Sequence, residues 1–528
     1  MADARMKVAL REYQAEQKAW ASKTLRAGAR GIALSAPTGT GKGTLAADIM
    51  ADIARAGKTV VATAPRREIV TDLHARVSAL GVRAGILAPW APPDPDALVQ
   101  IAPATARARR YHEMREPFAF LIDEAHHAPA PTYAGPLDAW RNARRLLFSA
   151  TFWRLDGLGF DHIAEALHQT RETGWFVDRG YLAEPEIFAP ATVDISGARG
   201  GPGSDYATRD MEEALEHQGI IGDLPAHFLN HVRPGGTGVA FCCSERHAEL
   251  VAETFNAAGV PADTLLGRDE GQVRDGKIAR LAGGAVQILA TVDVVSEGFD
   301  LPSIDAAILA RPTESLSLYL QQIGRALRAV YAPEADLRTD AGRLAAIAAG
   351  PKPRAVVLDH AGNVERHGHP LDPFIWKLAG GDVIARLEER TEDGLSLAVR
   401  RCDGCMRVFR TASICPYCGH EHAPDSRVPK WRAGELRRIE REEQRAAEEE
   451  DRKARRAAQA QARTFEALRN EGLRRNRGNH RKAYGYAAGV LGGRLVKAWK
   501  EGREAEAEEI EADMRAWGVK TIPERPDA

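Results

Sequence analysis

Short apolar runs alternate with stretches of helical composition through the first part of the chain. Between residues 25 and 150 these runs are Ile32 to Leu34, Val60 to Ala62, Leu98 to Ala102, Phe118 to Ile122 and Leu146 to Phe148. Such runs are typical of strands that are buried on both faces of a parallel sheet. The alanine-rich segment from Leu45 to Ala56 has the pattern of a helix between two of them. The alternation predicts an α/β domain.

The same alternation resumes later in the chain. A glycine-rich stretch from Ser196 to Ser204 predicts a loop, and apolar runs follow at Gly238 to Cys242, Val286 to Ala290, Ala306 to Leu309 and Ala355 to Leu358. A chain of 528 residues is too long for one core. We therefore predict two α/β domains in tandem, at residues 1–185 and 186–375.

The composition changes after about residue 375. We predict a small cysteine-rich module at 395–425, a charged, solvated helix at 430–470, and a C-terminal module at 474–528 that is first basic and aromatic and then acidic. The basic and aromatic part is either a second nucleic-acid contact or a small helical module with basic edges. Cys242 and Cys243 lie in an apolar run and are predicted to be buried packing residues.

Charge and hydropathy narrow the class of protein. The formal net charge is −1 with 27% charged residues, which leaves room for local basic patches. The first eleven residues have charges and no apolar core of a signal peptide, and no run of about 18 apolar residues occurs. We expect a cytoplasmic monomer without membrane contact.

A glycine-rich loop, Ser35 to Thr44, follows the first apolar run and precedes the first helical segment. Backbone N–H groups of such a loop point at phosphate oxygens, and the next helix N-terminus adds partial positive charge. Lys42 would reach the outer phosphates. The loop predicts a nucleotide site made of Pro37, Thr38, Gly39, Thr40, Gly41, Lys42, Gly43 and Thr44.

One residue of this loop departs from the usual pattern. Ser or Thr normally follows the lysine and holds Mg²⁺, but Gly43 stands there and the hydroxyl comes one residue later, on Thr44. The Gly-Lys-Gly-Thr ending resembles that of adenylate-kinase-type loops, which handle Mg-nucleotide. We expect a working site in which Thr44, or a water held by Asp123, completes the metal shell.

Two carboxylates, Asp123 and Glu124, end the apolar run that begins at Phe118. Open α/β sheets bind ligands at the edge where the carboxyl ends of their strands lie. Asp123 is predicted to hold Mg²⁺, and Glu124 to orient and deprotonate the attacking water. An isolated Asp-Glu pair is more often ordinary surface charge, but a phosphate loop upstream favours ATP hydrolysis.

Further motifs resemble those of superfamily 2 DEAD/DEAH-box helicases. Asp123 to His126 and Ser149 to Thr151 look like motifs II and III, Thr291 to Asp300 is similar to motif V, and Gln321 to Arg328 matches the motif VI pattern QxxGRxxR. The resemblance implies two RecA-like P-loop domains. Arginines from a neighbouring domain can stabilise charge on a transferring phosphoryl group, so Arg325 and Arg328 are the predicted pair.

The resemblance implies further roles. Gln14, in the run Leu10 to Gln14, would read adenine and select ATP; a plain helix-surface residue is the alternative. His126 would couple the nucleotide site to the second domain, and Gly298 and Asp300 would contribute to nucleotide binding. Two runs stand where motifs Ia and Ib contact nucleic-acid backbone, Thr63 to Arg66 and Gln100 to Thr105.

Several short sequence segments resemble the RadD branch of bacterial and phage DEAD/DEAH-box ATPases. The resemblance extends from about residue 8 to 425. The segments are Trp153 to Gly157, Ala310 to Thr313 and Val357 to Val364, followed by four cysteines. Phe152 stands where relatives tend to have proline. The branch implies DNA repair, recombination or phage replication, with DNA as a partner in preference to RNA, and single-strand-binding or recombination proteins as further partners.

Two CxxC pairs form the cysteine module, Cys402 with Cys405 and Cys415 with Cys418. Four thiolates at this spacing predict a closed, structural zinc ribbon that draws much of its folding energy from the metal. Redox chemistry and reduced core thiols are the alternatives. Arg401, Arg407 and Arg410 could touch phosphates there, or lie on a solvated surface.

The sequence thus predicts a DNA-stimulated helicase or translocase: two RecA-like α/β domains, a zinc ribbon and a helical tail, with ATP, Mg²⁺ and Zn²⁺. One alternative is a non-unwinding motor subunit of a larger DNA-processing complex. Another is a zinc-ribbon scaffold that binds nucleic acid and whose ATPase site is impaired by Gly43.

Overall fold

The computed structural model describes residues 10–104, 114–189, 205–206, 211, 220–269, 271–292, 304–380, 399–410, 414–422, 464–475, 480–519, 521–523 and 525. Several predicted features lie outside these residues: the loop at 196–204, Thr105, most of the charged helix at 430–470, and Gly298 and Asp300 of the motif V run. None of the helices in the described parts of the chain is long and apolar enough to cross a membrane.

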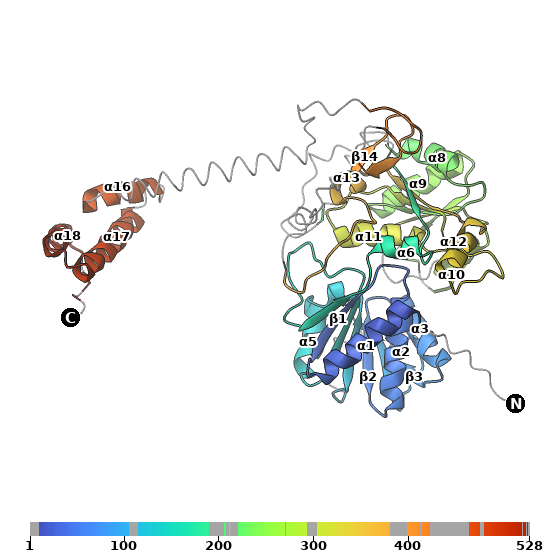
Figure 1. The fold of residues 1–528 in the computed structure, drawn as a ribbon, viewed down its shortest axis with the longest axis horizontal. Coiled ribbons are helices and arrows are strands. Elements are labelled where there is room, and N and C mark those ends of the chain that lie inside the picture. Colours follow the sequence, from blue (N-terminus) through green and yellow to red (C-terminus); the bar gives the residue numbers. More distant parts are fainter. Residues whose placement is uncertain are drawn as a thin grey trace. The chain divides into compact units, whose positions relative to one another are not determined.

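Seven parallel strands form the first sheet, in the order β3-β4-β2-β5-β6-β1-β7. They are β1 (Gly31–Ser35), β2 (Val60–Ala64), β3 (Ala84–Ile86), β4 (Val99–Pro103), β5 (Ala119–Asp123), β6 (Arg144–Ser149) and β7 (Ala166–Gln169). The helices of this domain are α1 (Glu12–Arg26), α2 (Lys42–Arg55), α3 (Arg67–Ala79), the 3-10 turn η2 (Ala125–His127), α5 (Pro131–Ala139) and α6 (Thr173–Asp178), coloured from blue to turquoise-green in Figure 1.

Six parallel strands form the second sheet, in the order β10-β11-β9-β12-β13-β8. They are β8 (Pro185–Phe188), β9 (Gly238–Phe241), β10 (Ala262–Leu265), β11 (Ile288–Thr291), β12 (Ala306–Leu309) and β13 (Ala355–Asp359). The helices are α8 (Ile220–His231), α9 (Glu245–Ala257), α10 (Gly271–Ala282), α11 (Leu316–Ala326), α12 (Asp340–Ala348) and α13 (Asn363–His367). Two tandem parallel α/β domains are thus confirmed.

Alternating side chains of each central strand enter two different cores. In β1, Ile32 and Leu34 pack with α2 and α3, whereas Ala33 faces the opposite core. This is the period-two alternation of a strand covered on both faces, and it explains why the runs are apolar throughout. Four strands were not predicted, β3, β7, β8 and β10, and each has only three or four residues.

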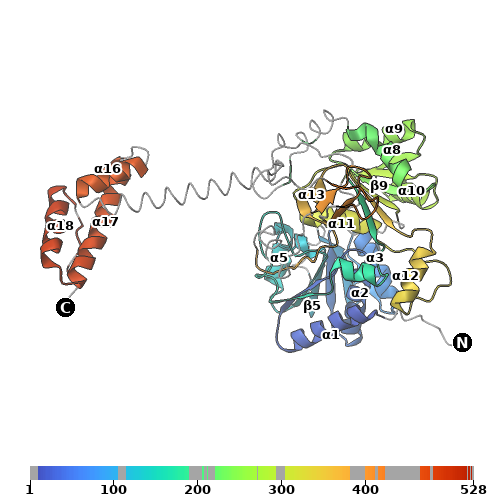
Figure 2. The same ribbon diagram turned by 45° about the horizontal axis from the view of Figure 1, so that its top comes forward.

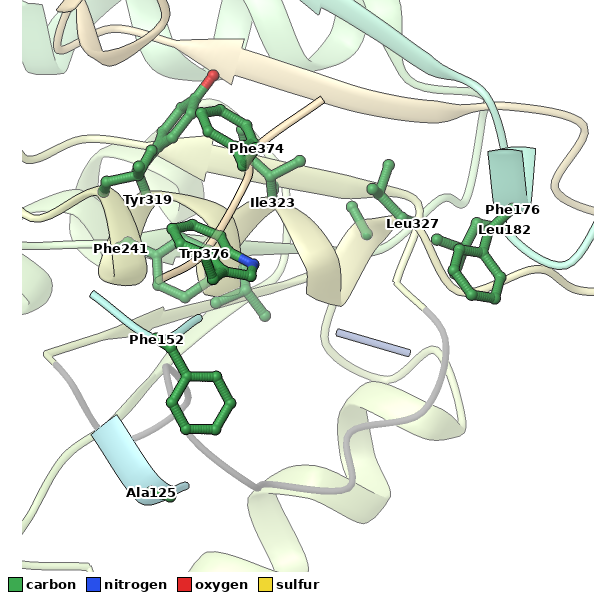
Figure 3. Packing of buried hydrophobic residues seen from close by; sticks show 14 of the residues in the cluster. Ala125, Phe152, Phe176, Leu182, Phe241, Tyr319, Ile323, Leu327, Phe374 and Trp376 are labelled. Atoms are coloured by element: carbon green, nitrogen blue, oxygen red, sulfur yellow. The ribbon is translucent and has the colours of Figure 1, made fainter. Parts of the chain in front are cut away.

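One apolar cluster is shared by the two sheets. It contains Phe120 and Leu147 from the first sheet, Phe241 from the second, and Tyr319 and Ile323 from α11. Figure 3 shows side chains of α11 from this cluster beside those of the segment that carries Phe374 and Trp376. Helix α11 is therefore packed into a core that both domains build.

A strap, defined as residues 370–380, runs from the second domain back onto the first. The Gln169 amide at the end of β7 pairs with the strap backbone: its Nε2 donates to Phe374 O and its Oε1 accepts from Trp376 N at 2.9 Å. Gly380 passes so close to the first domain that a Cβ on it would lie 2.0 Å from Gly157 O. The two domains are thus joined by the strap as well as by their shared core.

The cysteine module contains a two-stranded antiparallel ribbon, β14 (Val399–Arg401) and β15 (Val408–Arg410). In the described residues of a separate unit lie the helices α16 (Phe465–Arg475), α17 (His480–Lys500) and α18 (Glu504–Ala516). Leu491 and Leu495 of α17 are fully buried in its core beside Met514 of α18. In Figure 2 these three helices can be followed in red.

Candidate functional site

The glycine-rich loop connects the end of β1 to the start of α2. Gly39 and Gly41 have φ values of +85° and +88°, a region that side chains with a Cβ rarely adopt. A Cβ on Gly41 would also lie 2.6 Å from the Gln14 amide nitrogen. The Lys42 Nζ donates to Ala36 O at 3.0 Å, within the loop. The loop therefore has the tight, backbone-lined form that phosphate binding requires.

Helix α1 holds the loop from behind. The Tyr13 hydroxyl donates to Thr40 O at 2.6 Å, and Gln14 Nε2 donates to Gly41 O at 3.0 Å. The other end of the Gln14 amide accepts from Arg11 N at 2.9 Å. Gln14 is 5% exposed, so the plain surface position is wrong for it. Its partners in the structure are backbone groups, and adenine reading stays a prediction.

The paired carboxylates lie at the C-terminal end of β5. Burial, and next the nearby Glu124, raise the pKa of Asp123 to about 7, while Lys42 opposes the shift. Glu124 has a left-handed backbone with φ 50°, a strained conformation for a residue other than glycine. Its Oε2 is buried and accepts no hydrogen bond among the described residues; His126 Nδ1 is 3.5 Å away. A buried carboxylate oxygen that has no hydrogen-bond partner and lies in a strained turn is a feature of catalytic sites.

Helix α11 brings the motif VI arginines to this loop. A Cβ on Gly324 would lie 2.5 Å from Thr38 Cβ, so helix and loop are in direct contact through a residue without a side chain. Arg328 Cγ is 3.4 Å from the position of a Cβ on Gly39. Arg325 is 5% exposed. The absence of a side chain at Gly324 is what permits the approach.

Five charged groups share this space. Burial lowers the pKa of Lys42, Glu124 and Asp123 oppose the shift, and Arg325 and Arg328 add to it. The structure therefore brings together the lysine, both carboxylates and both arginines that the sequence singled out. Their roles in catalysis remain proposals.

A chain of hydrogen bonds runs from His126, next to the carboxylates, to α11. His126 Nδ1 is 3.2 Å from Ser149 Oγ, and Ser149 Oγ donates to Thr151 O at 2.7 Å. Thr151 Oγ1 and Ser317 Oγ, one in each domain, are 2.6 Å apart. His126 is thus connected through motif III to the first turn of α11, the helix that carries Arg325.

Lys352 is a residue that the sequence analysis missed. It is 2% exposed, and its Nζ donates to Ala326 O and, at 2.9 Å, to Arg328 O. A buried amino group at the carbonyl oxygens of the last residue of α11 and of Arg328 just after it satisfies groups that have no partner within the helix. A lysine before Pro353 in a polar stretch gives no signal of such burial, because its partners lie 24 and 26 residues upstream.

Comparisons with known proteins identify both domains. Residues 12–141 match the family described as "AAA domain" and residues 221–330 the "Helicase conserved C-terminal domain". The chain is 25% identical over 411 residues to a "51.5 kDa protein" of Lactococcus phage (isolate 7-9), covering 78% of this chain and 82% of that protein. It is 23% identical over 346 residues to the "Putative ATP-dependent helicase IRC3" of Saccharomyces cerevisiae, covering 60% of this chain.

These matches support helicase superfamily 2 as the family of this chain. They likewise support an ATP-hydrolysing enzyme of that superfamily. The match spans about half (49%) of the yeast helicase. A solved fragment of a putative HsdR subunit of a type I restriction enzyme from Vibrio vulnificus YJ016 has the same fold, with a TM-score of 0.51, 19% identity, and coverage of 70% of this chain and 68% of that one.

The residues of this helicase-family ATPase fit ATP with Mg²⁺. Two left-handed glycines shape the loop, and the unpartnered Glu124 oxygen lies beside Asp123 in one buried space. Asp123 would hold the metal, which would neutralise phosphate charge when bound. Thr44 fits less well, because its Oγ1 accepts a hydrogen bond from Arg76 Nη1 at 3.1 Å, and a cation beside a metal ligand is unfavourable.

The four cysteines of the module converge. All four sulfurs lie within 4.8 Å of one another. Cys402 Sγ is 3.6 Å from Cys418 Sγ, and Cys405 Sγ is 3.8 Å from Cys415 Sγ. A tetrahedron with Zn–S bonds of about 2.3 Å has edges of roughly 3.8 Å, so the set fits zinc, whereas a disulfide needs about 2.05 Å.

Arg407 attaches this module to the second sheet. Its Nη2 donates to Glu186 Oε1 at 3.1 Å, and its guanidinium lies over the rings of Phe188 and Tyr417. Met406 O also accepts from Ala189 N at 3.1 Å. Arg407 is thus engaged in holding the module to β8, which favours a structural role over the phosphate contact considered for it.

Cys242 and Cys243 are buried, at 0% and 4% exposure, as predicted. In the C-terminal unit, Tyr484, Tyr486 and Trp499 pack against its apolar core. The Tyr484 hydroxyl donates to Trp517 O at 3.0 Å. Of the two interpretations of this segment, the contacts of these aromatics support the helical module with basic edges.

Proposed function

We propose that this ATPase is a DNA-stimulated translocase or helicase, in which two motor domains close on Mg-ATP and move along DNA. The observation that carries the proposal is the contact of Gly324 with Thr38, which sets the motif VI arginines of one domain against the phosphate loop of the other. When the domains separate, such a site loses the motif VI arginines that the second domain contributes. ATP turnover can therefore be coupled to domain movement.

In this mechanism each charged residue has one task. Lys42, Arg325 and Arg328 stabilise negative charge on the phosphates, and Asp123 holds the metal. Glu124 orients the attacking water and takes its proton, which is why an unpartnered oxygen is useful there. The chain from His126 to Ser317 links that step to α11.

We also propose the domain limits 1–185 and 186–375 for the two motors, which place all of β8, the edge strand of the second sheet, except its first residue Pro185 in the second motor. The module at 395–425 is proposed to hold one structural Zn²⁺. The sequence segments that resemble the RadD branch support a preference for DNA. They also support a role in repair, recombination or phage replication. The comparisons include helicases of both DNA-processing and RNA-processing types, and support only nucleic acid in general.

Two displacement assays test the proposal. Wild-type chain should release the third strand of a DNA triplex when ATP is present, and Glu124→Gln should not. Strand displacement on forked DNA separates a helicase from a translocase that does not unwind, which is the motor-subunit alternative. Activity on forked RNA, with none on either DNA substrate, would contradict the proposal.

A further inference from the structure

Gln169 is the last residue of β7 and lies beside the start of the phosphate loop. In the parallel pairing of β7 with β1 it stands opposite Ser35, the residue from which the loop leaves the sheet. The next backbone N–H, that of Thr170, donates to Ser35 O at 3.0 Å. Gln17 Nε2 of α1 donates to the same oxygen at 3.0 Å. The backbone that carries Gln169 is therefore fixed relative to the phosphate loop.

The side chain of Gln169 binds the strap as a neighbouring strand would. Its Nε2 donates to Phe374 O, and its Oε1 accepts from Trp376 N at 2.9 Å. One amide thus pairs with a carbonyl and an N–H two residues apart, which is the pattern that a peptide group makes in a sheet. Phe374 and Trp376 are buried, at 6% and 8% exposure. Loss of the amide would leave polar groups of a buried segment unpaired, which is costly.

The strap in turn is fastened to α11. The rings of Phe374 and Trp376 are stacked, with centroids 5.9 Å apart and an angle of 10° between their planes. They belong to the same apolar cluster as Tyr319 and Ile323 of α11 (Figure 3). Just before the strap, Gly368 O accepts from the Tyr319 hydroxyl at 2.9 Å. A displacement of the strap would therefore be passed on to α11.

A second anchor on the first domain holds the far end of the strap. Phe160 N donates to Leu378 O at 2.6 Å. A Cβ on Gly159 would lie 2.4 Å from Gly380 N, so the two backbones touch. Gln169 and this anchor together hold the strap on the first domain on both sides of Trp376.

One pocket is bordered by the phosphate loop, β7, α11 and the strap. Its lining includes Thr38, Gln169, Ile323, Gly324 and Phe374. Because a pocket remains between these elements, solid packing alone does not set the separation of α11 from the loop. The strap and its anchors help to set it.

We propose that Gln169 is a positioning residue for ATP hydrolysis. By holding the strap, it sets α11, and with it Arg325 and Arg328, at the distance from the phosphate loop that hydrolysis requires. The inference rests on the proposed function, which places these arginines on the phosphates. This link is separate from the hydrogen-bonded path between His126 and Ser317, because it reaches α11 through the strap.

The test compares the rate of hydrolysis with the affinity for nucleotide in the full chain. Gln169→Leu keeps the approximate size of the side chain and removes both hydrogen bonds. With saturating DNA and enzyme in excess of ATP, the single-turnover rate constant should fall about tenfold, equivalent to about 1.4 kcal/mol. A misfolded fraction of enzyme does not change this rate constant. The dissociation constant of a non-hydrolysable fluorescent ATP analogue should stay within about threefold of wild type.

Gln287→Leu is the matched control. Gln287 Nε2 also donates to a backbone carbonyl, Gly236 O at 3.2 Å, but both residues lie within the second domain. This variant should have the wild-type rate constant. A wild-type rate constant in Gln169→Leu would overturn the proposal. So would a loss of nucleotide affinity as large as the loss of rate, because Gln169 would then support the folding of the loop rather than the placement of α11.

A double variant tests whether Gln169 acts through α11. Gly324→Ala pushes α11 away from Thr38 by itself, since its Cβ would lie 2.5 Å from Thr38 Cβ. In that background Gln169→Leu should slow hydrolysis by less than about twofold, because residues that act through one element are not additive. A full further tenfold loss would mean that Gln169 acts independently of α11, and would contradict the proposal.

The possible failures are distinguishable. If Gly324→Ala hydrolyses ATP at the wild-type rate, the contact on which the proposed function rests is wrong. If Gly324→Ala is slow and Gln169→Leu is not, only the role of Gln169 is wrong. Should Gln169→Leu not fold, Gln169→Glu decides. It keeps the acceptor for Trp376 N and replaces the donor to Phe374 O by an oxygen, so an unchanged rate constant would contradict the proposal.

Discussion

Gly324→Ala is a minimal change that should separate nucleotide binding from hydrolysis. The added methyl would lie 2.5 Å from Thr38 Cβ and 2.9 Å from Thr38 Cγ2. Carbon atoms pack at about 3.5 Å or more, so α11 and the phosphate loop must move apart by about 1 Å. Neither atom is the end of a long side chain that could turn away. The displacement therefore falls on the backbone of α11 or of the loop.

The magnitude follows from this distance. A misplacement of about 1 Å at a reacting centre can reduce the rate about 100-fold, equivalent to about 2.7 kcal/mol in activation free energy. Nucleotide affinity should change far less, since the glycine cradle and Lys42 belong to the first domain. We expect kcat to fall about 100-fold while the dissociation constant of the ATP analogue stays within about threefold.

Single-turnover hydrolysis with saturating DNA is the assay. Gly276→Ala is the matched control: this glycine lies in α10 with no atom within 4 Å of an added Cβ, so activity should be unchanged and stability should rise by up to about 1 kcal/mol. Thr38→Gly should restore most of the activity of Gly324→Ala by removing the clash. A Gly324→Ala enzyme with the wild-type kcat would refute a direct contact between α11 and the loop during hydrolysis.

Three further predictions concern other parts of the chain. Glu124→Gln should bind the ATP analogue normally and hydrolyse ATP at least about 100-fold more slowly in a phosphate-release assay, because the water loses its base; a smaller loss would remove Glu124 from that role. Cys415→Ser should lower the zinc content measured by mass spectrometry from one ion per chain towards zero, and destabilise the ribbon, whereas full retention of zinc would argue against a four-thiolate site. Burial lowers the pKa of Lys352 to about 7. Between about pH 7 and 10.5 the unfolded chain therefore binds a proton that the folded chain does not. The contribution of Lys352 to the free energy of unfolding rises with pH in this window. In Lys352→Met, denaturant unfolding should show a slope of stability against pH that is smaller by up to about 1.4 kcal/mol per unit in this window, and an unchanged slope would mean that Lys352 is charged when folded.

The fold and the charged residues of the nucleotide site could be predicted from local sequence patterns. The central strands could be predicted because a strand covered on both faces must be apolar throughout. Asp123 and Glu124 directly follow such a run, and Lys42 begins the helix after the glycine-rich loop. The short strand β7 was missed because its residues are only partly buried and its pattern is weak. Its last residue, Gln169, nevertheless receives the strap.

Long-range contacts were beyond the reach of the sequence. Gly324 could be read as part of a motif, but its fit against Thr38 depends on how two domains meet. For Gln14 the resemblance implies a contact with adenine, which stays a prediction, and the structure adds hydrogen bonds to backbone groups of the loop and of Arg11 that the sequence did not predict. Side-chain partners of this kind follow from packing and not from spacing.

The most direct test of the central claim is the steady-state ATPase rate of the full chain, measured with and without single-stranded and duplex DNA at two salt concentrations. DNA should stimulate hydrolysis, stimulation should weaken at the higher salt, and Lys42→Ala should reduce the rate to background. A rate that no DNA changes, or that survives intact in Lys42→Ala, would contradict a DNA-stimulated motor built on this nucleotide site.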